Sequence, residues 1–216
     1  MINSVQRTLH EIGLSHKLDK AYSHKYTEEF YPRHIEALRE AAETVVEIGV
    51  WDGGSLRMWS EYFRNARIIG VDINFSRIKA PIERTSLRYA DQSSLTDLSI
   101  ALWDVELGSV DLFIEDGMHS SRCQQICFGA MFNRVRPGGI YIIEDLQSSI
   151  TWPQEQDERV TTLAMLQKFM RSQKLDTDYM SSEARDYIGS LIDKIDIYTR
   201  TPSFDTSVAA VIYRKG

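Results

Sequence analysis

The chain alternates between two hydrophobic patterns from about residue 44 onward. Short continuous apolar runs, typical of buried strands, are separated by stretches in which apolar residues recur every three or four positions, as on one face of a helix. Strands that alternate with helices through short joints predict an α/β fold, a Rossmann-like and mostly parallel sheet with right-handed crossovers and helices on both faces. The expected parallel strands lie at 44–50, 67–72, 86–91, 110–114 and 139–143.

The two ends of the chain are expected to complete this sheet in different ways. Residues 1–42 predict a helical cover, with a short amphipathic helix over 1–18 and a second helix that Thr27 can cap. Two apolar runs near the end, 195–198 and 207–213, are close enough in sequence to pair as an antiparallel hairpin. This hairpin brings the expected sheet to seven strands.

The segment between the parallel strands and the hairpin is polar at first. We interpret residues 147–157 as a loop above the strand ends, where an active-site lid would lie. Helices are expected near 158–171 and 183–191. Because the chain has no repeats, no low-complexity segment and no change of composition, we expect a single domain over 1–216.

Composition narrows the range of partners. With 216 residues, 43% of them apolar, the chain is long enough for one large core. A net charge of −6 and the lack of a Lys/Arg-rich run argue against nucleic acid as a partner. No apolar run approaches membrane-spanning length, and the N-terminus lacks the order of a signal peptide. The only cysteines, Cys123 and Cys127, are expected as free thiols on one helical face, which favours a reducing, cytoplasmic setting.

The glycine-containing loop after the first strand indicates a nucleoside cofactor. Dinucleotide-binding loops have a glycine in the middle of G-x-G-x-x-G, so that a pyrophosphate can approach the backbone. In Glu47-Ile-Gly-Val-Trp-Asp-Gly-Gly54, Trp51 fills that place, which argues against a nicotinamide-dependent oxidoreductase. S-adenosylmethionine (SAM) has no pyrophosphate, so the loop need only clear its methionine half. Asp72 is positioned for the ribose hydroxyls, and Asp91-Gln92 for the adenine edge.

Acidic pairs follow two further strands, Glu115-Asp116 and Glu144-Asp145. If these strands are neighbours, the carboxylates and the imidazole of His119 meet at the carboxyl edge of the sheet, where open α/β sheets bind ligands. Crowded carboxylates repel one another, and a hard cation such as Mg²⁺ relieves that repulsion. Because successive strand residues face opposite ways, only one acid of each pair should reach the site. In the first pair we favour Asp116, which is nearer the strand tip.

Coordination to a divalent cation would make an alcohol a better nucleophile, since it favours the alkoxide. Two adjacent sugar hydroxyls could chelate the same ion and become oriented toward a methyl donor. His119 is a candidate general base, because it follows Asp116 by three residues at the loop that begins the next helix. An unperturbed imidazole titrates near neutrality, where such a base is most useful.

Together these motifs resemble the class I SAM-dependent methyltransferases, and in particular the metal-dependent sugar O-methyltransferases of macrolide biosynthesis with the related cephalosporin hydroxylase proteins. The resemblance runs from about Asp19 to the C-terminus. It rests on Glu47-Ile-Gly-Val-x-x-Gly-Gly-Ser55, Gly70-Val-Asp72, Asp91-Gln92, Asp116-Gly-Met-His119, Pro137-Gly-Gly139 and Glu144-Asp145.

The resemblance implies a SAM pocket, a metal site and a base. It implies Mg²⁺ or Mn²⁺ held by Asp116, Glu144 and Asp145, with His119 as the base. The segments Asp19-Lys20 and His24-x-Tyr26 resemble the strip that covers the cofactor in this family. The residues expected to bind SAM are Glu47, Gly49, Gly53, Ser55, Asp72, Asp91, Gln92, Asp116 and Tyr26.

The expected function is therefore SAM- and Mg²⁺-dependent O-methylation of a hydroxyl, with a sugar hydroxyl favoured, on a natural-product or glycoside acceptor of antibiotic biosynthesis. An alternative with the same motifs is a SAM-binding partner protein of an oxygenase, which would transfer little methyl alone. The expected partner is a small molecule, neither nucleic acid nor membrane. Crowded aromatic residues in the first third of the chain and the resemblance favour a homo-oligomer, a tetramer or hexamer, over packing within one subunit.

Overall fold

The computed structural model describes residues 6–148, 160–201 and 206–216. At its centre is a seven-stranded sheet in the order β3-β2-β1-β4-β5-β7-β6. Strands β1 to β5 are parallel, whereas β7 pairs antiparallel with both β5 and β6, which confirms the predicted fold and its C-terminal hairpin. The strands are β1 (Thr44–Ile48), β2 (Arg67–Asp72), β3 (Thr85–Tyr89), β4 (Val110–Glu115), β5 (Val135–Ile143), β6 (Ile192–Arg200) and β7 (Ser207–Arg214).

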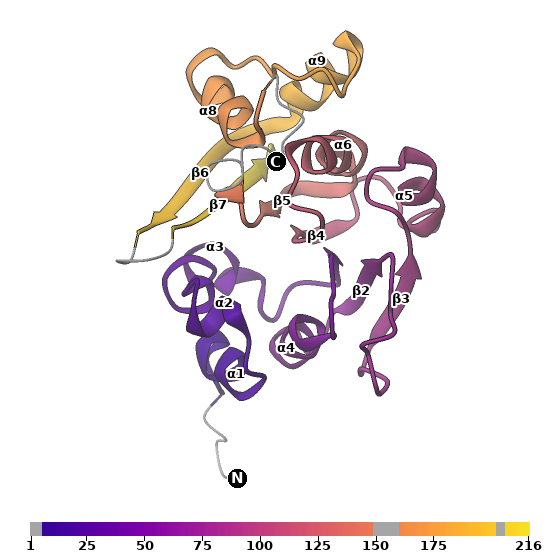
Figure 1. Ribbon diagram of the computed structural model, residues 1–216, viewed down its shortest axis with the longest axis vertical. Coiled ribbons are helices and arrows are strands. Elements are labelled where there is room, and N and C mark those ends of the chain that lie inside the picture. Colours follow the sequence, from indigo (N-terminus) through magenta and orange to yellow (C-terminus); the bar gives the residue numbers. More distant parts are fainter. Residues whose placement is uncertain (1–5, 149–159, 202–205) are drawn as a thin grey trace.

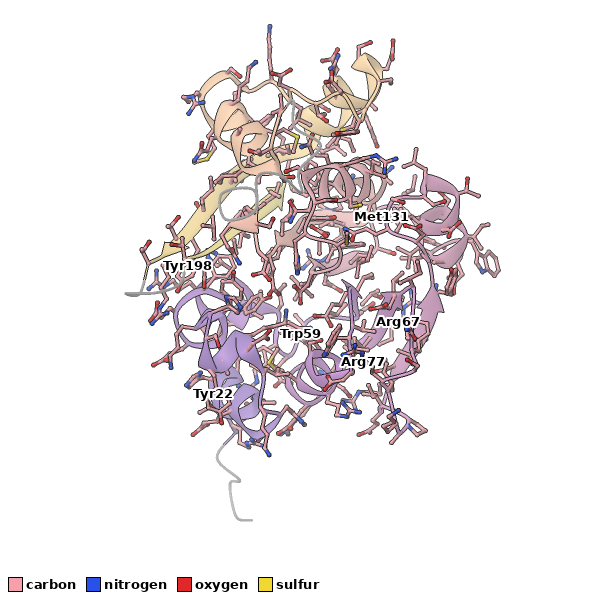
Figure 2. All side chains as sticks on the ribbon, in the orientation of Figure 1. Tyr22, Trp59, Arg67, Arg77, Met131 and Tyr198 are labelled. Carbon is pink, nitrogen blue, oxygen red and sulfur yellow. The ribbon has the colours of Figure 1, made fainter. Side chains whose placement is uncertain are left out.

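Helices cover both faces of this sheet (Figure 1). Because successive strand residues point to opposite faces, Val45 of β1 packs into one apolar layer and Val46 into the other. Trp59 and Met131 lie in these two layers, on either side of the sheet (Figure 2). The first layer contains the N-terminal segment and α4 (Gly54–Tyr62); the second contains α5 (Leu95–Ala101), α6 (Ser121–Met131), α8 (Thr162–Ser172) and α9 (Ser182–Leu191).

The N-terminal cover is more broken than predicted. The prediction of one helix over 1–18 is wrong. Helix α1 starts only after a capping box formed by Thr8 and Glu11, and the backbone of Lys17 is left-handed (φ 57°), which ends the helical segment. Thr27 caps nothing; it lies inside a π-helical turn, and its hydroxyl is 3.0 Å from His10 Nδ1. The elements are α1 (Leu9–Ser15), α2 (Asp19–Tyr22), η1 (Tyr26–Phe30), α3 (Pro32–Ile35) and η2 (Glu36–Leu38).

Two other expectations concern the cysteines and the predicted lid. Cys123 and Cys127 are free and buried on α6, as the helical spacing predicts. Residues 149–157 of the predicted lid lie outside the described residues. The two residues before them are buried, and the Gln147 side chain accepts a hydrogen bond from the Val208 N–H at 2.8 Å, which ties the start of this loop to β7. Within the described part of the chain, no helix combines the length and hydropathy needed to cross a membrane.

The strand order determines where a ligand can enter. From β1 the chain builds the sheet outward through β2 and β3, then returns to the other side of β1 at β4. The connections therefore leave β1 and β4 in opposite directions, which opens a crevice at their carboxyl ends. The acidic motifs singled out in the sequence lie at this edge, in the last residues of β1, β2 and β4 or shortly after β3, β4 and β5.

Candidate active site

A cavity of about 1250 Å³ lies at the carboxyl ends of the parallel strands. Its walls come from the loops after β1, β2, β3, β4 and β5, and from residues 16–20 of the N-terminal cover. Among the predicted site residues, those that line it are Gly49, Ser55, Asp72, Asp91, Gln92, Asp116, His119 and Asp145. The structure places Tyr26, Glu47, Gly53 and Glu144 behind this lining.

Gly49 allows the loops after β1 and β4 to come into contact. It has φ +86°, and a Cβ there would lie 2.0 Å from the carbonyl oxygen of Asp116. No side chain fits that space, and the positive φ also favours glycine. The first glycine of the loop therefore positions Asp116. Gly53 (φ +79°) precedes α4, and a Cβ there would lie 2.8 Å from Cδ1 of Ile82. Its contact with a cofactor stays a prediction.

Asp72 is fixed by the backbone of two loops. Its carboxylate accepts hydrogen bonds from the N–H groups of Val50 (2.8 Å) and Trp51 (3.3 Å), and from that of Asn74 (2.9 Å). These bonds connect the end of β2 to the glycine loop and hold an anionic acceptor in the cavity wall. A carboxylate held in this way is preorganised for a ligand with hydroxyl donors.

The loop after β3 contributes one half-buried acid and one engaged amide. Asp91 accepts two hydrogen bonds from Ser93, which lower the pKa of the Asp91 carboxyl. Gln92 donates from Nε2 to Glu115 and accepts from the Met118 N–H at 2.6 Å. Both ends of this amide therefore brace the loop after β3 against the end of β4 and the loop that follows it. A primary amide has two N–H donors and two acceptor lone pairs, so the contact of Gln92 with adenine stays a prediction.

Glu115 and Asp116 point to opposite sides, as strand alternation requires. Glu115 is fully buried, and burial raises the pKa of its carboxyl to about 8, so it is mainly neutral at pH 7. Asp116 lines the cavity and remains one-fifth exposed. Glu47 is also fully buried; burial raises the pKa of Glu47 to about 7, and its carboxylate accepts a hydrogen bond from Ser55 at 2.6 Å.

Trp51 is the exposed aromatic residue of the cavity rim. Its side chain is 65% exposed, and its ring is covered by the guanidinium of Arg77 at 3.4 Å from the ring centroid. The residue that sequence analysis used against a pyrophosphate therefore lies in the cavity wall, with one ring face against a cation.

A buried ammonium lies within the acidic cluster. Lys20 of α2 is 4% exposed, and its Nζ donates to both oxygens of Glu144 at 2.7 Å and to Asp116. Nζ is also 4.0 Å from Glu47. Burial alone would lower the pKa of Lys20, but Asp116 and Glu144 raise it well above its usual range, so the ammonium stays charged. Tyr31, fully buried, donates to Glu144 from the other side.

Asp145 is turned toward the cavity by its own backbone. Its φ of +54° interrupts the strand alternation, so Asp145 lines the cavity while Glu144 stays inside. Its carboxylate accepts hydrogen bonds from Tyr26 at 3.1 Å and Gln147 at 2.9 Å, and lies 3.5 Å from His119 Nε2. Tyr26 therefore supports Asp145 from behind the lining. His119 Nδ1 is buried and has no hydrogen-bond partner among the described residues.

The residues present fit a divalent cation. Asp116, His119 and Asp145 each offer one ligand atom, and these atoms lie within 4.8 Å of one another. Two carboxylates and an imidazole suit Mg²⁺ or Mn²⁺, with the carboxylate oxygens preferred by the harder ion. The predicted set of Asp116, Glu144 and Asp145 differs at one place, since both Glu144 oxygens are bonded to Lys20.

Sequence analysis missed Lys20 and Tyr31 as parts of the site. Lys20 was placed only in a covering strip, and Tyr31 only among aromatic residues of the cover. One signal was available: buried carboxylates at neighbouring strand ends need a counter-charge, and that charge can come from a lysine as well as from a metal.

Comparison with known proteins finds methyltransferases that are similar to this chain. A methyltransferase domain family matches residues 46–146. The 8-demethyl-8-alpha-L-rhamnosyl tetracenomycin-C 2'-O-methyltransferase of Streptomyces olivaceus is 40% identical over 172 residues, which are 74% of this chain and 44% of that protein. The mycinamicin VI 2''-O-methyltransferase of Micromonospora griseorubida is 37% identical over 133 residues, 57% of this chain and 32% of that protein.

Solved structures extend the similarity to the whole fold. The structure of MycE methyltransferase from the mycinamycin biosynthetic pathway, in complex with Mg, SAH and mycinamycin VI, aligns with a TM-score of 0.78 and 26% identity. The alignment covers 98% of this chain and 56% of that one. The chain thus spans about half the length of these relatives or less.

Proposed function

We propose, from the premise that this chain carries a methyltransferase domain of the class I fold, that it is a SAM- and Mg²⁺-dependent O-methyltransferase. Its acceptor is a hydroxyl, with a sugar hydroxyl favoured, on a small natural product or glycoside. The sugar O-methyltransferases named above support this class of acceptor. A place in antibiotic biosynthesis follows from the same similarity.

One observation carries the proposal: a single cavity joins the nucleoside-binding loops to the acidic cluster. Asp72 and Asp91 lie on one side of it, and Asp116, His119 and Asp145 on the other. A methyl donor held at the first side would present its methyl group toward an acceptor held at the second. Such an arrangement makes the transfer effectively unimolecular, because both reactants are oriented before the reaction.

Each side of the cavity has a defined task in this proposal. Asp72 accepts hydrogen bonds from the ribose of SAM, and Gly49 keeps the glycine loop against Asp116 so that the two sides stay in register. Gln92, which lines the cavity, is assigned to the adenine edge together with Asp91. Its bonds to Glu115 and Met118 use one N–H donor and one lone pair of the amide, and they brace the floor of the nucleoside side.

Asp116 and Asp145 hold the metal, and His119 removes the proton of the acceptor. Bound Mg²⁺ would lower the pKa of an acceptor hydroxyl and help to orient it. Tyr26 and Gln147 hold the Asp145 carboxylate in place beside His119. Because the hard cation prefers carboxylate oxygens, we assign the imidazole of His119 to the proton rather than to the metal.

Replacing Asp72 by Asn should weaken SAM binding by at least about tenfold, or about 1.4 kcal/mol, because a charged hydrogen-bond acceptor is lost. Isothermal titration calorimetry on the purified protein measures this affinity. Asp104→Asn is the matched control, since Asp104 pairs with Arg88 outside the cavity lining and its replacement should leave the affinity unchanged. Equal affinities in the two variants would remove Asp72 from the cofactor site.

A homo-oligomer, a tetramer or hexamer, in a cytoplasmic setting is also part of the proposal. Of the aromatic residues behind the sequence argument, Tyr26, Phe30 and Tyr31 are buried in this chain's own core, at most 2% exposed, whereas Tyr22 is 57% exposed. Support comes instead from the edge strand β3 and the segment around α5, where Tyr89 and Trp103 are 63% and 80% exposed. Light scattering at micromolar concentration should give a multiple of the 24.9 kDa chain mass; a monomer mass would refute this assembly.

A further inference from the structure

We propose that the Lys20 ammonium is a built-in counter-cation of the acidic cluster, which a divalent cation must displace in order to bind. The inference rests on the metal dependence in the proposed function. Lys20 would then be a positioning residue: it keeps the cluster assembled in the metal-free protein and competes with the metal for the same carboxylates.

The contacts of Lys20 leave none of its donors unused. A lysine ammonium has three N–H donors, and those of Lys20 reach two oxygens of Glu144 and one of Asp116. Glu47, 4.0 Å away, adds a further carboxylate to the same charge. Without this ammonium, Glu47, Asp116 and Glu144 would be buried or partly buried carboxylates with no cation among the described residues within ion-pair distance. Lys20 therefore stabilises the metal-free arrangement.

Asp116 is the residue that both cations need. It is bonded to Lys20, and it is also one of the three groups whose ligand atoms lie within 4.8 Å of one another. A divalent cation on Asp116 would lie within a few ångströms of the ammonium. At such distances like charges repel by several kcal/mol even at an effective dielectric constant of about 20, so the two cations exclude each other.

The cavity beside Lys20 has room for its side chain after displacement. Lys20 lines the cavity, so its flexible side chain can swing toward that space when its partners are taken. Displacement would free Glu144, whose two oxygens are otherwise occupied. The set of Asp116, Glu144 and Asp145 that the family resemblance implies then becomes available to the metal. Competition by Lys20 thus accounts for the difference between the expected ligand set and the three groups whose ligand atoms lie together in the structure.

The test compares Lys20→Met with wild type in two measurements on the full chain. Met retains the apolar stem and removes the charge. The melting temperature of the metal-free protein should fall by roughly 5–15 °C, the scale for breaking a buried ion pair in a chain of this size. The affinity for Mg²⁺ alone, measured by calorimetry without SAM or acceptor, should rise by at least about tenfold. Lys168→Met, at an exposed pair with Asp176, should change neither quantity.

The opposite directions of the two effects distinguish displacement from simple support. If Lys20 is only a structural clamp, the variant melts lower and binds Mg²⁺ equally or more weakly, which overturns the inference while leaving the proposed function intact. If wild type itself binds no divalent cation, the metal dependence fails and the inference fails with it. Should Lys20→Met not fold, Lys20→Met/Glu144→Gln removes both charges of the pair. It should bind Mg²⁺ more tightly than Glu144→Gln alone, and equal or weaker binding would again overturn the inference.

Discussion

Chelation of divalent cations with EDTA should abolish methyl transfer by this protein, and Mg²⁺ or Mn²⁺ should restore it. Asp116 and Asp145 bring two carboxylates to the cavity, and without a divalent cation an acceptor hydroxyl keeps its proton too tightly to attack a methyl sulfonium. A turnover assay with and without EDTA, followed by titration of each metal, measures the effect.

Cofactor binding provides the control for this experiment. The residues assigned to SAM, such as Asp72, are fixed by backbone N–H groups, so calorimetry should show SAM binding after chelation. Asp116→Asn and Asp145→Asn should reproduce the loss of turnover, whereas Asp104→Asn, outside the cavity lining, should not. Full activity in EDTA would mean that the carboxylates serve the fold alone.

Replacing His119 by Ala should lower turnover by roughly 10²–10⁴, the usual range for loss of a general base. His119 lines the cavity, and its Nε2 is 3.5 Å from Asp145, so it lies beside the position assigned to the acceptor. SAM and Mg²⁺ affinities, measured by calorimetry, should stay within a few-fold of wild type. His34→Ala is the matched control, because His34 lies on α3, packs against Phe30 and does not line the cavity.

The same variant separates the two roles that the geometry allows to His119. If the imidazole is a metal ligand, as its place beside Asp116 and Asp145 permits, Mg²⁺ affinity should fall together with turnover, and excess Mg²⁺ should recover much of the activity. If His119 is the base, excess Mg²⁺ recovers nothing. Near-normal turnover in His119→Ala would assign the proton to water or to a carboxylate.

Local patterns in the sequence were sufficient to predict the sheet and the edge that holds the site. Apolar runs such as 68–71 lie inside a strand, because the part of a strand that is buried on both faces must be apolar. The acids placed at the strand ends then had to meet once the strands were parallel neighbours. Strand alternation also separated Glu115 from Asp116 correctly, since one is buried and the other lines the cavity.

Contacts between distant segments could not be predicted from these patterns. Lys20 is 96 positions from Asp116 and 124 from Glu144, and nothing in its neighbourhood indicates that its ammonium is buried between them. The left-handed backbone at Asp145, which turns that carboxylate into the cavity, is likewise set by tertiary structure. The hydrogen bond between the Gln92 amide and the buried carboxyl of Glu115 cannot be recognised from periodicity either.

The function itself is tested most directly by a methyl-transfer assay on the purified protein. The assay supplies SAM, Mg²⁺ and a panel of natural-product glycosides with free sugar hydroxyls, and mass spectrometry follows both products. The proposal predicts a glycoside heavier by one methylene unit, with one S-adenosylhomocysteine formed for each methyl group transferred. The contrary result is that SAM binds, no glycoside in the panel is methylated, and the protein instead supports the reaction of an added oxygenase. The chain would then be a SAM-binding partner protein, and the proposed transferase activity would be contradicted.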